Sequence, residues 1–110
     1  MPDKTYTRRA AIWSAVWDLM AKGYRIDRCC GKDRTFDLIA WNKKTTLCLL
    51  IRTARTAHVR SYRDDVVRIG ALVRESMIPG PVELWLYHPQ GRTRYAILSG
   101  GALVIGEESA

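Results

Sequence analysis

Residues 46–53 read TLCLLIRT, and this stretch decides how the rest of the chain is interpreted. From Leu47 to Ile51 apolar residues occupy both alternating sets of side chains, which is typical of a strand covered on both faces of a sheet. The run then enters a cluster, RTART (52–56), that is basic and contains no acidic residue. The stretch therefore predicts a central strand that ends in positive charge.

Two further strands are expected before it. The segments YRIDRCC (24–30) and TFDLIAW (35–41) have strand-like patterns, and the turn sequences GKDR and NKKT follow them. Three strands joined by short turns predict a meander.

A helix is expected over residues 5–22, with Thr5 or Thr7 as its cap and Gly23 just beyond its end. Two adjacent apolar stripes run along it at helical spacing. They consist of Ile12, Val16 and Leu19, and of Trp13, Trp17 and Met20. We expect one stripe to pack on the sheet, and the Trp13/Trp17 face either to add to the core or to form the contact of a homodimer.

A second helix is expected over 59–77, followed by strands at 82–88 and 93–99. The tail 99–110 either adds an edge strand or is partly loose. The order αβββαββ predicts an α/β (α+β) class. We expect a single domain over residues 1–110, with a mixed sheet of about five strands between two helices. The crossover helix lets the fourth strand run parallel to a central one.

Composition favours a nucleic-acid partner. The 110 residues carry a net charge of +7, with 13 Arg and 5 Lys, and Arg is suited to bidentate contact with phosphate. No apolar run is long enough to cross a membrane, so no membrane partner is expected.

The three cysteines are an odd number, and two are adjacent, which favours a reducing cytoplasm over a disulfide scaffold. Together with His58 and His88 they lack the spacing of a zinc site, so we expect buried strand cysteines instead.

The order of elements and several local sequences resemble the PD-(D/E)XK nuclease superfamily. The similarity is greatest to small archaeal Holliday-junction-resolvase-like and endonuclease-like proteins. The segments that carry the resemblance are AVWDLMAKGYRIDRC (15–29), TFDLIAW (35–41), LLIRTAR (49–55) and PVELWLYHPQGRTRYAIL (81–98). The resemblance implies a restriction-endonuclease-like fold and places Asp37 at the first acidic position of a metal-binding strand.

The chain departs from this family where the chemistry would occur. An acid, an apolar residue and a Lys are expected on the central strand, but Arg52, Thr53 and Ala54 stand there. A lone carboxylate holds Mg²⁺ weakly, and an adjacent Arg repels the ion. We therefore predict no catalytic residue, no metal site and no cofactor, with Asp37 and Arg52 vestigial. An ion pair between these two is favoured over an Asp37 that caps a turn or faces water.

The remaining basic residues are candidates for phosphate contact. The predicted nucleic-acid-binding set is Arg8, Arg9, Arg52, Arg55 and Arg63. We expect Arg60 and Arg68 to form a surface ion-pair ladder with Asp64.

Three functions follow. The first is a nuclease-fold protein that binds nucleic acid, with DNA favoured, without cutting it. The second is an active Mg²⁺-dependent endonuclease with a relocated site around Asp37. Its spare ligand or catalytic candidates are Asp27, Glu75, Glu83 and Lys32. The third is a structural or interaction module without nucleic acid.

Overall fold

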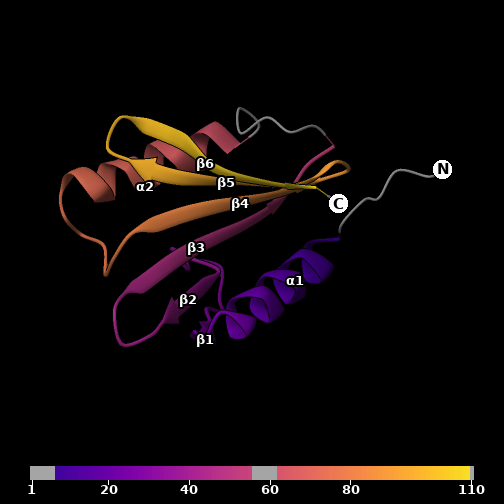
Figure 1. Cartoon of the computed structure of the whole chain (residues 1–110). Helices are drawn as coiled ribbons and strands as arrows, with labels where there is room; N and C mark the ends of the chain where they lie inside the picture. Colours follow the sequence, from indigo (N-terminus) through magenta and orange to yellow (C-terminus); the bar gives the residue numbers. More distant parts are fainter. Residues whose placement is uncertain (1–6, 56–61, 110) are drawn as a thin grey trace.

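The computed structural model describes residues 7–55 and 62–109. Within these ranges the chain forms two helices and six strands (Figure 1). The elements are α1 (Arg8–Ala21), β1 (Arg25–Arg28), β2 (Leu38–Trp41), β3 (Thr46–Thr53), α2 (Arg63–Arg74), β4 (Val82–His88), β5 (Gly91–Leu98) and β6 (Gly101–Ser109). The expected order of elements is confirmed, with one strand added at the end.

The strands form a single sheet in the order β1-β2-β3-β4-β5-β6. Every neighbouring pair is antiparallel except β3 and β4, which are parallel, with Leu50 opposite Leu84. The connection through α2 carries the chain back to start β4 beside the beginning of β3, as a parallel pair requires. The mixed sheet predicted from the sequence is thus confirmed.

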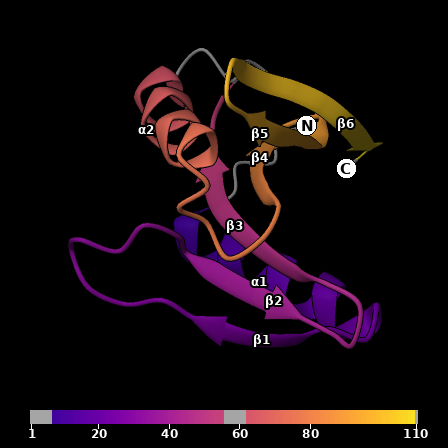
Figure 2. The ribbon, with the colours of Figure 1, turned by 90° about the vertical axis from the view of Figure 1, so that its left-hand side faces the viewer.

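The two helices lie on opposite faces of the sheet (Figure 2). Alternate residues of β3 divide between two core clusters: Leu49 and Ile51 pack beneath α1, while Cys48 and Leu50 pack beneath α2. β3 is therefore covered on both faces, as its uninterrupted apolar sequence predicts.

Helix α1 begins and ends with the chemistry that its sequence predicts. The Thr7 side chain accepts a hydrogen bond from the Ala10 amide at 3.1 Å, and Gly23 follows the helix with φ +88°. The apolar stripe of Ile12, Val16 and Leu19 is buried against the sheet. Thr5 lies outside the described residues.

The first two strands are shorter than expected because the segment between them turns away from the ladder. β1 ends at Arg28 and β2 begins only at Leu38. Gly31, with φ +102°, lies within this turn, where its conformation favours glycine. Asp37 consequently precedes β2 instead of lying inside it.

The tail forms the edge strand β6, so the expectation of about five strands is corrected to six, and the alternative of a partly loose tail is wrong for residues 101–109. A two-residue turn, at Ser99 and Gly100, brings β6 back along β5. The buried Arg92 of β5 forms ion pairs with Asp18 of α1, at 2.6 Å, and with Glu108 of β6. Burial opposes the charge on this guanidinium, but the polar partners around it raise the pKa of Arg92.

Helix α2 is shorter than the expected 59–77, although residues 59–61 lie outside the described part of the chain. It ends at Arg74, and Met77, expected beside the buried stripe, is 68% exposed. None of the described helices is long and apolar enough to cross a membrane.

A test of the packing concerns Gly80, which precedes β4. A Cβ atom at this residue would lie 2.1 Å from the backbone carbonyl oxygen of Thr46. We expect Gly80→Ala to lower the free energy of unfolding by roughly 1–3 kcal/mol, as overpacking does, measured by urea denaturation. Gly100→Ala is the control, because nothing lies within 4 Å of the added methyl group. Equal stability of the two variants would contradict the close approach.

Candidate nucleic-acid interface around Asp37

Backbone hydrogen bonds fix Asp37 between β3 and the residue that follows β1. Its amide donates to the carbonyl of Leu49 in β3 at 2.9 Å, and its carbonyl accepts from the amide of Cys29 at 2.9 Å. The side chain is 5% exposed. A carboxylate in such a place requires polar partners, because burial without them is costly.

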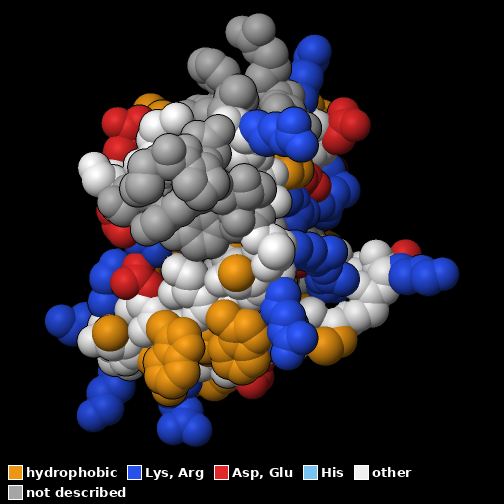
Figure 3. Space-filling view, turned by 90° about the vertical axis from the view of Figure 1, so that its right-hand side faces the viewer, with side chains coloured by type: hydrophobic (Ala, Val, Ile, Leu, Met, Phe, Trp, Pro, Cys, Tyr) orange, Lys and Arg blue, Asp and Glu red, His pale blue; other side chains and the backbone are white. Residues whose placement is uncertain are grey.

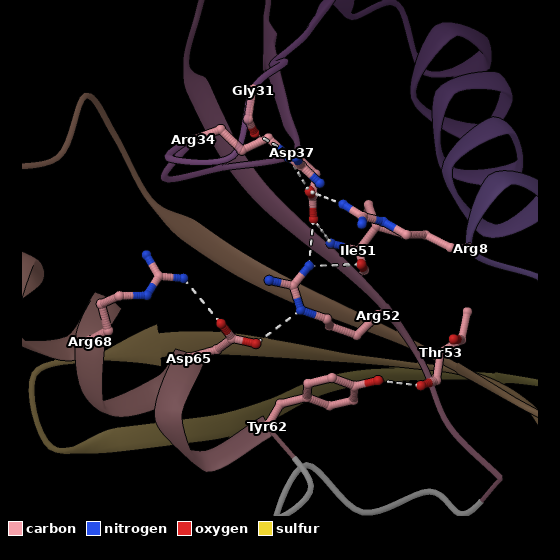
Figure 4. Close-up of polar contacts among 10 residues, drawn as sticks. All are labelled: Arg8, Gly31, Arg34, Asp37, Ile51, Arg52, Thr53, Tyr62, Asp65 and Arg68. Atoms are coloured by element: carbon pink, nitrogen blue, oxygen red, sulfur yellow. Dashed lines mark hydrogen bonds and ion pairs between the residues drawn. The ribbon is translucent and has the colours of Figure 1, made fainter.

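Four donors surround this carboxylate (Figure 4). One oxygen accepts from Arg8 of α1 at 3.2 Å and from Arg34 of the preceding turn at 2.9 Å. The other accepts from the backbone amide of Ile51 at 2.8 Å and from Arg52 of β3 at 2.7 Å. The expected ion pair between Asp37 and Arg52 is present, and two further guanidinium groups join it.

Arg52 connects this cluster to α2. Its Nε donates to Asp65 at 2.9 Å, and its guanidinium lies 5.8 Å from the centre of the Tyr62 ring. Burial opposes the charge of Arg52, but the hydrogen bonds and negative charges of Asp65 and Asp37 outweigh this and raise its pKa. The Arg52 side chain is thus held cationic between two carboxylates.

Asp65 continues the network to Arg68, which donates to it at 3.0 Å. Burial acts to raise the pKa of Asp65, but the hydrogen bonds and charges of Arg52 and Arg68 lower it overall. Sequence reasoning missed Asp65, and it placed Arg68 in a ladder with Asp64. Only the fold brings residue 65 opposite residue 52.

Arg34 was also missed as a partner of Asp37. It lies three residues before Asp37, and it also donates to the carbonyl of Gly31 at 2.7 Å. The three-residue separation of Arg34 and Asp37 was the available signal. Both residues lie in a turn, however, where sequence periodicity does not predict the direction of a side chain.

A pocket of about 710 Å³ opens over this cluster. Five of its lining residues are basic and two are acidic, so its surface is positively charged. The basic residues are Arg8, Lys32, Arg34, Arg52 and Arg68, and the acidic residues are Asp33 and Asp37.

A second pocket, of about 560 Å³, shares Arg8, Arg34 and Asp37 with the first and adds Arg9 and Arg28. The two pockets therefore form one concave basic surface, which we call the basic groove, along the start of α1. Of the predicted phosphate contacts, Arg8, Arg9 and Arg52 line this groove.

The other two predicted contacts do not line it. Arg55 and Arg63 are exposed but belong to neither pocket. His58 and Arg60 lie outside the described residues. Of the described members of the basic cluster that begins at Arg52, only Arg52 lines the groove.

The groups around Asp37 do not fit a hard divalent cation. Such an ion takes six or more oxygen ligands, usually from several carboxylates, carbonyls and waters. Here both oxygens of Asp37 face N–H donors, three of them from cationic guanidinium groups. Within residues 7–55 and 62–109 there is no group of three or more His, Cys, Asp or Glu side chains that could hold a metal ion.

The spare acids considered from sequence have other surroundings. Glu83 accepts from Trp85 at 2.8 Å and from Arg94 at 3.0 Å, and Asp27 lines a different groove, beside Trp13. Lys32 does line the Asp37 pocket, and Glu75 is exposed at the end of α2. Among the cysteines, Cys48 is buried as expected, whereas Cys30 is exposed, which corrects that expectation.

No protein-family model matches the chain, and no curated protein matches it in sequence. Among solved structures, the chain is similar to Hjc of Archaeoglobus fulgidus, a Holliday junction resolvase from an archaeal hyperthermophile. The TM-score is 0.59 and the identity 15%, over 90% of this chain and 88% of that chain. The chain therefore shares the fold of that structure, and the restriction-endonuclease-like fold expected from the sequence is confirmed.

The Asp65 network gives a pH-dependent prediction. Because the pKa of Asp65 is lower in the folded state than its ordinary value of 3.8, its stabilisation is complete above that pH and is lost as the pH falls below it. We expect Asp65→Asn to lower the free energy of unfolding by about 1 kcal/mol at neutral pH. On acidification the free energy of unfolding of the variant should fall less steeply than that of the parent protein, measured by urea unfolding from pH 6 down to about pH 2.5.

Asp64→Asn is the matched control, because Asp64 lies in the same helical turn but is exposed. The Asp64 variant should retain the acid dependence of the parent protein. If both variants changed it equally, the effect would come from the helix terminus and not from Arg52 and Arg68.

Proposed function

We propose that this protein binds DNA through the basic groove and does not cut it. The observation that carries the proposal is the set of three guanidinium groups around the buried Asp37 carboxylate. At the position where the sequence resemblance implies a metal-binding acid, positive side chains stand in place of a cation. The groove thus presents fixed positive charge to a phosphate backbone.

The guanidinium groups around Asp37 retain capacity for an additional anion. Each has five N–H donors, and in the described contacts each uses one of them on Asp37. Arg8 is 57% exposed, so it can turn part of its guanidinium toward a ligand in the groove. Phosphate oxygens are acceptors that match this planar arrangement of donors.

The absence of cutting rests on the surroundings of Asp37. Hydrolysis of a phosphodiester by a metal-dependent route requires an ion that stabilises the developing charge and helps to form hydroxide. A cation at either oxygen of Asp37 would have to displace a guanidinium and would then be repelled by its charge. The same guanidinium groups favour retention of the phosphate backbone as a bound anion.

DNA is the proposed nucleic acid because one similar solved structure is that of a Holliday junction resolvase. The net charge of +7 supports a polyanionic partner. The cytoplasmic location expected from the cysteines belongs to the same proposal.

Binding is tested by fluorescence anisotropy with labelled duplex DNA at several salt concentrations. We expect affinity to fall with salt, and the double variant R8A/R9A to reduce the salt slope by about two and to weaken binding roughly tenfold or more. The matched control is K43A/K44A, which also removes two exposed positive charges, at the opposite end of β2 from Asp37. Equal losses in both variants, or no binding at low salt, would contradict an interface at the basic groove.

The second arm of this experiment is a plasmid-nicking assay with Mg²⁺ and with Mn²⁺. We expect the protein to bind the plasmid and leave it intact. Cleavage that Asp37→Ala abolishes would show a working site at Asp37 and overturn the proposal.

A further inference from the structure

A second groove, which we call the aromatic groove, runs between α1 and the edge strand β1. Its volume is about 590 Å³, and apolar atoms make up most of its lining. The aromatic and aliphatic side chains that line it are Trp13, Val16, Met20, Tyr24, Ile26 and Trp41. Figure 3 shows hydrophobic side chains gathered on one part of the molecular surface, with Lys and Arg side chains around them.

Trp13 stands where the aromatic groove meets the basic groove. It lines both, as does Arg28, whose guanidinium lies 5.7 Å from the centre of the Trp13 ring. Trp13 is 42% exposed, so much of its surface remains open. Trp17 is more exposed still, but it lines neither groove.

The charges around the aromatic groove favour a nucleic-acid strand over a second copy of this chain. Arg25 and Arg28 line it with a single acid, Asp27, so its rim is net positive. In a two-fold dimer through this face, each patch would meet its own copy and bring net positive charge against net positive charge. A nucleic-acid strand combines aromatic bases with negative phosphates and complements both features.

The spacing along α1 supports the same occupant. Arg9 and Trp13 are four residues apart, which places them as neighbours on one face of the helix. Arg9 lies in the basic groove, where the phosphate backbone is proposed to run. A base attached to that backbone therefore has an aromatic platform beside it, and stacking on such platforms needs no particular base.

We propose that an unpaired base of the bound DNA stacks on Trp13 in the aromatic groove, next to phosphates held by Arg8 and Arg9. This inference rests on the proposed DNA binding and adds to it a preference for DNA that exposes a base. It also assigns the Trp13 face to DNA, whereas the sequence left it between core packing and a dimer contact.

The test uses three labelled oligonucleotides with the 110-residue protein. One is a duplex, one is the same duplex with a single bulged nucleotide, and one has an abasic bulge that keeps the phosphate but lacks the base. We expect the intact protein to bind the bulge with the base about 5- to 100-fold more tightly than the abasic bulge. Trp13→Ala should abolish this preference, while Trp13→Phe should retain part of it.

Trp17→Ala is the matched control, because it removes an exposed indole from the same helix outside both grooves, and it should keep the full preference. The sedimentation profile of each variant reports whether a dimer is present. The inference would be overturned if Trp13→Ala weakened binding to the base-bearing bulge and to the abasic bulge equally. Loss of the preference in Trp17→Ala would also overturn it. A dimer that Trp13→Ala dissociates would also overturn it and assign the face to a second copy.

The outcomes separate this inference from the function on which it rests. If R8A/R9A weakens duplex binding but the intact protein shows no preference for the exposed base, the stacking site alone is overturned. Failure of the intact protein to bind any of the three DNAs at low salt would overturn both proposals.

Discussion

The carboxylate of Asp37 is buried, and the structure around the candidate site depends on how its charge is satisfied. A helix, a turn and a central strand each contribute a guanidinium group, and β3 adds a backbone amide. A buried charge that lost these partners would be strongly destabilising, so the carboxylate ties α1, the turn before β2 and β3 to one point. The same interaction fixes the electrostatic character of the surface above it.

That character is cationic because the acids in the network are outnumbered. Asp37 and Asp65 are shared among Arg8, Arg34, Arg52 and Arg68, so the cluster retains positive charge after every ion pair is formed. Under the proposed function, the positive charge of Arg52 on β3 favours anionic phosphate at this site and repels a divalent cation. The proposal therefore rests on the charges of the site and not on the fold, because one fold can carry sites with different functions.

The sequence predicted best the elements whose burial leaves a periodic pattern. The observed bounds of β3 and β4 equal the predicted strands 46–53 and 82–88, because both strands are largely buried and their sequences are mostly apolar. β1 and β2 were overextended, since Gly31 and the turn around it interrupt the ladder in a way that side-chain alternation does not reveal. The edge strand β6 left only an ambiguous pattern, because Leu103, Val104 and Ile105 are all exposed.

The candidate site was predicted in part, for a related reason. The Asp37–Arg52 pair was predicted from the family resemblance, which places both residues at one site, and from the cost of burying a carboxylate without a partner. Asp65 reaches Arg52 only through the packing of α2 on the sheet, and Arg34 reaches Asp37 through an irregular turn. Neither arrangement has a sequence signature. Arg55 and Arg63 are close to β3 in sequence but do not line the groove, so their predicted contact with nucleic acid stays a prediction.

The most direct test of the account is a calorimetric titration of the protein with Mn²⁺, compared with the same titration of Asp37→Asn. If guanidinium groups occupy the position of a metal ion, neither protein will show a saturable site, and the two titrations will coincide. A saturable Mn²⁺ site that is present in the parent protein and lost in Asp37→Asn would contradict the account.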